Sequence, residues 1–214
     1  PYGLPGLLTK LRRLFPEVSY AIHERQTAIL TEELRSGAID LGLLARSFDD
    51  RSLAGADFAA EPFVLVAPKG HPLAGSGAIS SRELVGASLM LMADGHCLRD
   101  QAIEVCAAAG PPPATSVAAA SLSTLVRMVE SGLGATLIPA SALGAEVRDG
   151  QGIAARSFGK SPPGRTLTLQ WRESSPDASW FTEIAEVLRA HYLEFNKTMP
   201  KIAGGKPRIR ALGG

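Results

Sequence analysis

Hydrophobic positions along the chain follow two periods, and each period predicts one kind of element. A spacing of three and four residues predicts amphipathic helices, over residues 4–15, 27–37, 96–109, 121–132 and 179–195. Short apolar runs bounded by turn residues predict strands, over residues 18–24, 38–45, 61–75, 87–92, 114–119, 135–142 and 165–171. Pro16 ends the first helix, Thr27 and Ser121 fit helix starts, and Gly37 and Gly132 fit helix ends.

The order of these elements predicts an α/β fold. Helix, strand, helix and strand at the beginning of the chain imply a parallel sheet covered on both faces. We expect the chain to cross from one lobe to the other near Glu61–Phe63 and to cross back near Arg165–Leu167. This predicts two α/β lobes joined by two crossovers. One lobe comprises residues 1–62 and 166–214, and the other comprises residues 63–165. Lobes of this kind place a ligand cleft between them.

Composition narrows the class of protein. With 45% apolar and 20% charged residues the chain can bury a core, and its 22 basic residues nearly balance its 21 acidic ones. This balance argues against a nucleic-acid footprint over the whole chain, and no apolar run reaches the ~18 residues of a membrane span. The chain shows no signal peptide and begins with Pro1 rather than Met, so we expect a fragment without its N-terminal portion. Residues 197–214 are basic and Gly-rich, and we expect a mobile terminus there.

Cys97 and Cys106 are the only cysteines, and they lie nine residues apart in one predicted helix. Unpaired N–H groups at the helix start, with His96 and Arg99 beside them, favour a thiolate at Cys97 and its oxidation by peroxide. The alternative is two ordinary thiols in a reducing cytosol. Nine helical residues rise about 13.5 Å and end on opposite faces, whereas a disulfide needs Cα atoms about 4.4–6.8 Å apart. A bond between the two therefore requires the helix to unwind.

Three stretches resemble the effector-binding domain of LysR-type transcriptional regulators: SGAIDLGLLA, EPFVLVAPKGHPLA and SLSTLVRMVESGLGATLIPASA. The resemblance runs from Pro1 to about Phe195. The stretch DGHCLRDQ, followed by a second cysteine nine residues after its own, resembles the peroxide-sensing members of that family. The resemblance implies two Rossmann-like lobes of the periplasmic-binding-protein kind. It also implies a winged helix-turn-helix for DNA contact that precedes this chain.

The same resemblance implies roles for individual residues. Cys97 would be the peroxidatic cysteine and Cys106 the resolving one. His96 would orient peroxide or water, or make only a structural hydrogen bond, and Asp100 would pair with a cation or assist proton transfer.

Two further residues of the implied pocket come from distant parts of the sequence. The Thr27 hydroxyl would bind peroxide, act as a helix cap, or do both. Arg165 would lie near the reactive thiol, or be a surface charge at the crossover between the lobes.

The leading hypothesis is therefore a cytoplasmic, hydrogen peroxide-sensing regulatory domain of a transcription activator, and not an enzyme. The family implies a dimer of regulatory domains within a tetramer, DNA bound through the preceding domain, and a thiol reductant that resets the sensor. No metal or cofactor is expected, since the chain has neither a metal-ligand spacing nor a phosphate-binding glycine loop. A metabolite-binding LysR-type domain is the alternative. A thiol peroxidase and a periplasmic solute-binding protein are further alternatives that the sequence favours less.

Overall fold

The computed structural model describes residues 2–45, 50–108, 110, 118–148, 150 and 152–212. The chain divides into two compact units. Unit 1 comprises Pro1–Ala60, Thr166–Lys197 and Ile209–Gly214, and unit 2 comprises Glu61–Arg165 and Thr198–Arg208. The predicted lobes differ from these units chiefly in the tail, because residues 198–208 belong to unit 2 and not to the first lobe. Pro62 and Glu61 also belong to unit 2.

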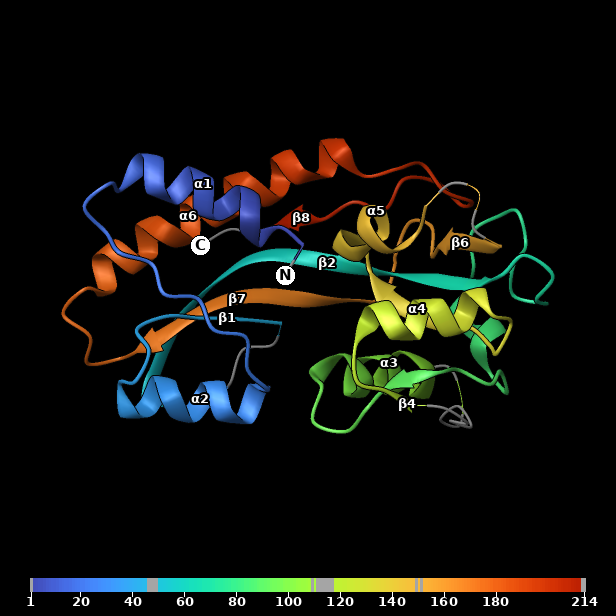
Figure 1. Cartoon of the computed structure of the whole chain (residues 1–214), viewed down its shortest axis with the longest axis horizontal. Coiled ribbons are helices and arrows are strands. Elements are labelled where there is room, and N and C mark those ends of the chain that lie inside the picture. The colour runs from blue at the N-terminus through green and yellow to red at the C-terminus, as the bar shows by residue number, and fades with distance from the viewer. Residues whose placement is uncertain are drawn as a thin grey trace. The chain divides into compact units, whose positions relative to one another are not determined.

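Unit 1 is built on antiparallel strands with helices packed beside them (Figure 1). Its elements are α1 (Leu4–Leu14), α2 (Thr27–Ser36), β1 (Gly42–Leu44), the first half of β2 (Leu53–Pro68), most of β7 (Gly164–Arg172), α6 (Ala178–Thr198) and β8 (Arg210–Ala211). The strand β7 lies between β1 and β2, and β8 pairs with β2. The helix α6 buries a stripe of side chains at helical spacing, namely Phe181, Ile184, Ala185, Leu188 and Tyr192.

Unit 2 contains the second half of β2, which lies between two antiparallel neighbours, β5 (Thr136–Pro139) and β6 (Ile153–Ser157). The short strands β3 (Leu91–Met92) and β4 (Ala118–Ala119) pair in parallel. Its helices are α3 (Cys97–Ala107), α4 (Leu122–Glu130) and α5 (Leu143–Glu146), with 3₁₀ helices η1 (Ser81–Leu84) and η2 (Ala140–Ala142). A parallel bridge between Leu89 and Ala135 connects the segment of β3 to that of β5.

Several helix boundaries agree with the sequence patterns. Gly37 ends α2 with a φ of 80°, a left-handed conformation that glycine adopts without strain. The Ser121 hydroxyl accepts the Thr124 N–H at the start of α4, at 3.1 Å. Thr27, by contrast, is the first helical residue of α2 rather than its cap, because Gln26 occupies the cap position. The expectation that Thr27 caps this helix is wrong.

Two predictions about strands are also wrong. Residues 18–24 form no strand, and their side chains are exposed or half-buried, so the run has no sheet surface against which to pack. The predicted parallel sheet of the first elements is antiparallel, since β1 pairs with the late strand β7. Sequence order alone does not reveal this, because β7 enters unit 1 more than a hundred residues after β1.

Residues 197–212 are ordered where we expected a mobile terminus over residues 197–214, of which residues 213 and 214 lie outside the described part of the chain. Met199 and Ile209 are buried, and both backbone groups of Ile209 bind the side-chain amide of Asn196, at 2.6 and 2.7 Å. The Ser157 N–H donates to the Ala203 carbonyl at 2.9 Å, and β8 then pairs with β2. Apolar residues alternating with basic ones let this segment bury one side while its charges stay in solvent.

Candidate functional site

Both cysteines lie in α3, and a tight turn sets where that helix begins. The His96 N–H donates to the Ala93 carbonyl, and Gly95 has a φ of 85°. A side chain at Gly95 would be strained in this conformation, so glycine fits the turn of the DGHC sequence. His96 is the N-cap residue in an extended conformation, and Cys97 is the first helical residue. The Cys97 thiol is therefore placed where helical N–H groups lack partners within the helix and stabilise an anion.

The two cysteines occupy different environments. Leu98, Ala102, Val105 and Cys106 belong to the buried face of α3. Cys106 is 2% exposed, and burial raises the pKa of its thiol, because the thiolate would lose its hydration. Cys97 is half-buried and lies outside this buried face. The thiol that small reagents can reach is thus at the helix start, and the second thiol is held neutral within the core.

The helix α3 begins at one particular edge of the sheet in unit 2, namely the edge where the parallel strands end. The strands β3 and β4 are parallel, and the bridge from Leu89 to Ala135 is parallel as well, so β3, β4 and β5 end at the same edge. The helix α3 follows β3, α4 follows β4, and η2 follows β5 directly. Several helix starts therefore gather at these carboxyl ends, which is where α/β sheets ordinarily bind anionic and polar ligands.

A buried ion pair lies at the same edge. In the pairing of β2 with β5, Phe63 is opposite Pro139, so Glu61 lies level with Ser141, the second residue of η2. The Glu61 carboxylate accepts the Ser141 N–H at 2.7 Å and both the Nε and the Nη2 groups of Arg165 at 2.8 Å. The Glu61 side chain is fully buried, and that of Arg165 is 13% exposed. Arg165 is thus held in one orientation and is not an ordinary surface charge.

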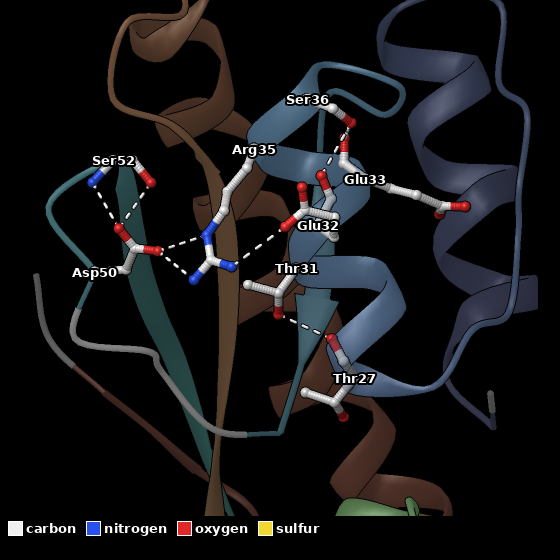
Figure 2. Close-up of polar contacts among 8 residues, drawn as sticks. All are labelled: Thr27, Thr31, Glu32, Glu33, Arg35, Ser36, Asp50 and Ser52. Atoms are coloured by element: carbon white, nitrogen blue, oxygen red, sulfur yellow. Dashed lines mark hydrogen bonds and ion pairs between the residues drawn. The ribbon is translucent and has the colours of Figure 1, made fainter.

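The remaining residues expected in the site are placed as follows. His96 is half-buried, and its side chain makes no capping hydrogen bond. Asp100 is exposed in the first turn of α3, where the helix dipole favours a carboxylate. Thr27 belongs to unit 1, whereas the other five belong to unit 2. Within α2 its carbonyl accepts the Thr31 hydroxyl at 2.8 Å, as Figure 2 shows.

Three contacts at this edge were not anticipated from the sequence. Arg99 donates to the exposed carboxylate of Asp94 at 2.8 Å, which connects the first turn of α3 to the turn before it. The other two are the contacts that the Glu61 carboxylate makes with Ser141 and with Arg165. The available signal was an acidic residue directly before the apolar run PFVLV, because a carboxylate buried at such a position needs a cationic partner.

No metal site is formed by the residues that the structure describes, since they contain no cluster of three or more histidine, cysteine or acidic side chains suited to a metal ion. Within the same described ranges, no helix has both the length and the apolar character needed to cross a membrane.

Comparison with known families matches residues 1–192 to the LysR substrate binding domain. The hydrogen peroxide-inducible genes activator of Pectobacterium carotovorum subsp. carotovorum is 35% identical over 201 residues, which are 94% of this chain and 66% of that protein. The DNA-binding transcriptional dual regulator OxyR of Escherichia coli (strain K12) is 37% identical over 190 residues, 89% of this chain and 62% of that protein. The chain thus spans about three fifths to two thirds of the length of these relatives.

Solved structures agree with this result. A Corynebacterium glutamicum OxyR C206 mutant superimposes with a TM-score of 0.83 at 32% identity, covering 91% of this chain and 61% of that one. The reduced form of the OxyR regulatory domain from Pseudomonas aeruginosa superimposes with a TM-score of 0.77 at 32% identity, covering 89% and 92%. The predicted fold class, an α/β chain with the periplasmic-binding-protein-like architecture of LysR effector domains, is thereby confirmed. The chain belongs to the LysR substrate binding domain family, and its relatives there include OxyR of Escherichia coli and other hydrogen peroxide-inducible genes activators.

Proposed function

We propose that this chain is a hydrogen peroxide-sensing regulatory domain in which Cys97 is the peroxidatic cysteine and Cys106 the resolving one. The observation that carries the proposal is the placement of both thiols on α3. Cys97 is accessible at the helix start, at the carboxyl edge of the sheet, and Cys106 is buried on the opposite side of the same helix. The names of the relatives describe hydrogen peroxide-inducible activators, and this supports hydrogen peroxide as the signal that the chain senses.

The first chemical step uses the sulfur of Cys97 as nucleophile. The thiolate attacks one oxygen of H₂O₂, a sulfur–oxygen bond forms, and the oxygen–oxygen bond breaks. The leaving hydroxide takes a proton and becomes water, while Cys97 becomes a sulfenic acid. Cys97 is the first residue of α3, where the unpaired helical N–H groups favour negative charge. We assign His96, Asp100 and Arg165, which all belong to unit 2, to the peroxide pocket as candidates for orienting peroxide and supplying this proton. The role of Thr27, which belongs to unit 1, stays a prediction from the sequence.

The second step joins the two cysteines. The Cys106 sulfur attacks the sulfenic sulfur, a disulfide forms, and the hydroxyl leaves as water with the Cys106 proton. About 13.5 Å of helical rise separates the two positions, and a disulfide spans Cα atoms at most about 6.8 Å apart. The helix α3 must therefore unwind between the cysteines. Unwinding gives up several backbone hydrogen bonds at about 1 kcal/mol each and exposes Leu98 and Val105.

The rearranged segment is the signal in this proposal. A disulfide that holds a strained, non-helical segment is readily reduced, so a cytoplasmic thiol reductant resets the sensor. In the full-length protein the change would alter packing within a homotetramer of paired regulatory domains, and thereby the contact of a preceding DNA-binding domain with its site. The function proposed for the chain is regulatory rather than enzymatic, because a sensor needs to react once for each signal.

Mass spectrometry of the intact protein after one equivalent of H₂O₂ tests this function. Wild type is expected to lose two hydrogens through a Cys97–Cys106 bond, and Cys106→Ser is expected to gain one oxygen at Cys97 that dimedone traps. Cys97→Ser is the control and is expected to react with neither reagent. If Cys97 stays a free thiol in both wild type and Cys106→Ser, the sensing function is wrong, and thermal-shift screening with small metabolites would then test the alternative of a metabolite-binding domain.

A further inference from the structure

Glu61 is a buried carboxylate that the proposed chemistry does not yet use. Its side chain is fully buried, and its two oxygens have different partners. Oε1 accepts the Ser141 N–H at the start of η2, and Oε2 accepts Arg165 through Nε and Nη2. The backbone approaches closely here as well, because a Cβ on Gly164 would collide with the Glu61 carbonyl. The carboxylate is thus held by Ser141 on one oxygen and by Arg165 on the other, and the backbone that carries it is closely packed against Gly164.

The arrangement of strands places this pair on the cysteine's side of the sheet. The antiparallel register of β2 and β5 puts Glu61 at the carboxyl end of β5. The parallel bridge between Leu89 and Ala135 puts the carboxyl end of β3, and hence the start of α3 at Cys97, at the same edge. All these residues belong to unit 2. Arg165 and the reactive thiol therefore share an edge irrespective of any family resemblance.

We propose that Glu61 is a positioning residue, which holds the Arg165 guanidinium so that its remaining N–H groups face the peroxide that reacts at Cys97. This inference rests on the proposed function and adds to it a residue that acts through Arg165 rather than on the substrate. A guanidinium has five N–H donors in a rigid plane. Glu61 engages one edge of that plane, Nε and Nη2, so the donors on the Nη1 side point away from the carboxylate.

The geometry has a chemical consequence for the leaving oxygen. Negative charge develops on that oxygen as the oxygen–oxygen bond breaks, and oriented N–H donors stabilise it. A freely rotating arginine would have to be ordered during the reaction, whereas one fixed by a buried carboxylate is ordered beforehand. Glutamine in place of Glu61 has a single acceptor oxygen, so it cannot serve both the Ser141 N–H and the two nitrogens of Arg165.

A purely structural ion pair would predict a different result from a positioning residue. Loss of a structural pair lowers stability without selecting among reagents that attack Cys97. Loss of positioning slows the reaction with H₂O₂, which needs the leaving oxygen stabilised, more than alkylation by iodoacetamide, which does not. The ratio of the two second-order rate constants at Cys97, measured in folded protein, therefore separates the two roles.

The experiment measures this ratio in a Cys106→Ala background, in which oxidation stops at the sulfenic acid. We expect Glu61→Gln to lower the ratio by at least about tenfold, and Glu61→Asp, which keeps the charge but is one methylene shorter, to lower it by less. Circular dichroism and a cooperative thermal transition establish that each variant is folded. Glu83→Gln is the matched control, because Glu83 also pairs with a mostly buried arginine of unit 2, Arg156, at 3.3 Å. It is expected to leave the ratio unchanged within about twofold.

A double-mutant cycle completes the test. If Glu61 acts through Arg165, the effect of Glu61→Gln on the ratio disappears when Arg165 is already replaced by lysine. A ratio unchanged in both Glu61 variants, or an effect of undiminished size in the Arg165→Lys background, would overturn the inference while the sensing function stands. If Cys97 with Glu61 intact reacts with H₂O₂ no faster than free cysteine, the proposed function itself has failed, and the two failures are thus distinguished.

Discussion

Cys97 and Cys106 are the first and tenth residues of one continuous α-helix, α3, and only the second of them belongs to its buried face. Helical geometry separates the two Cα atoms by about 13.5 Å along the axis and turns the two side chains to opposite sides. In this conformation neither sulfur can reach the other. The structure therefore corresponds to the reduced form of the proposed sensor, and the bond requires another conformation.

Hydrogen exchange across α3 is expected to report that change. Amides of residues 101–105, which lie beyond the unpaired first turn of α3, are expected to exchange slowly in reduced protein and at least about tenfold faster after one equivalent of H₂O₂, because unwinding exposes them. Exchange followed by mass spectrometry measures this, with α4 of the same unit as an internal reference. Cys106→Ser treated with H₂O₂ is expected to keep slow exchange. Equal protection of α3 before and after a verified disulfide would contradict the requirement for unwinding.

Burial of Cys106 leads to a prediction about pH. Because its pKa is raised above the ordinary value of 9.0 in the folded state, the unfolded chain loses this proton first as the pH increases. The protonated thiol of Cys106 thus makes its full contribution to the free energy of unfolding below the ordinary pKa. This contribution is lost as the pH rises through the pKa of the folded state. Thermal midpoints of reduced protein measured from pH 7 to pH 10 are expected to fall more steeply for wild type than for Cys106→Ala. Parallel curves for the two proteins would show that Cys106 ionises alike in both states.

Asp50, in unit 1, leads to a pH dependence of the opposite sign, in which stability is lost as the pH falls. Its carboxylate accepts the hydroxyl and the backbone N–H of Ser52, at 2.7 and 2.9 Å, and pairs with Arg35, as Figure 2 shows. These contacts lower its pKa from 3.8 to about 2, with the Ser52 hydroxyl as the largest cause. The stabilisation is therefore present above pH 3.8 and is lost as the pH falls towards 2.

The carboxyl resonance of Asp50, followed by NMR titration, is expected to show this low midpoint. Ser52→Ala removes the hydroxyl donor and is expected to raise the midpoint part of the way to the ordinary value. Chemical unfolding is expected to show that the deficit of Asp50→Asn relative to wild type narrows between pH 5 and pH 3. A deficit that is constant over this range would mean that the contacts in Figure 2 do not hold the carboxylate in solution.

The sequence predicted the parts of this fold that depend on local patterns. Helices with apolar stripes and glycine or serine boundaries, such as α4 after Ser121, were anticipated because their determinants lie within a few residues. The helix through both cysteines was anticipated for the same reason. Pairings between distant segments were not, and the antiparallel contact of β1 with β7 is the clearest case. Glu61 was missed because its role depends on Arg165, 104 residues further along the chain.

The ordered tail gives a last prediction, because one side chain of α6 holds it. The Asn196 amide donates to the Ile209 carbonyl and accepts the Ile209 N–H. Removing both bonds in Asn196→Ala leaves two part-buried backbone groups without this partner, so we expect a loss of about 2 kcal/mol in the free energy of unfolding. Asn196→Asp keeps an acceptor for the N–H but turns an oxygen toward the carbonyl, and is expected to be no better.

Thr182→Ala is the control on the same helix, since its exposed hydroxyl only donates back to Ala178, and we expect a change below about 0.5 kcal/mol. Urea denaturation measures the three variants beside wild type. Because Ile209 is buried and immediately precedes β8, release of this contact should also speed amide exchange in Arg210 and Ala211, which pair with β2. If Asn196→Ala matches Thr182→Ala in stability and leaves that exchange unchanged, the tail is held by its apolar side chains alone.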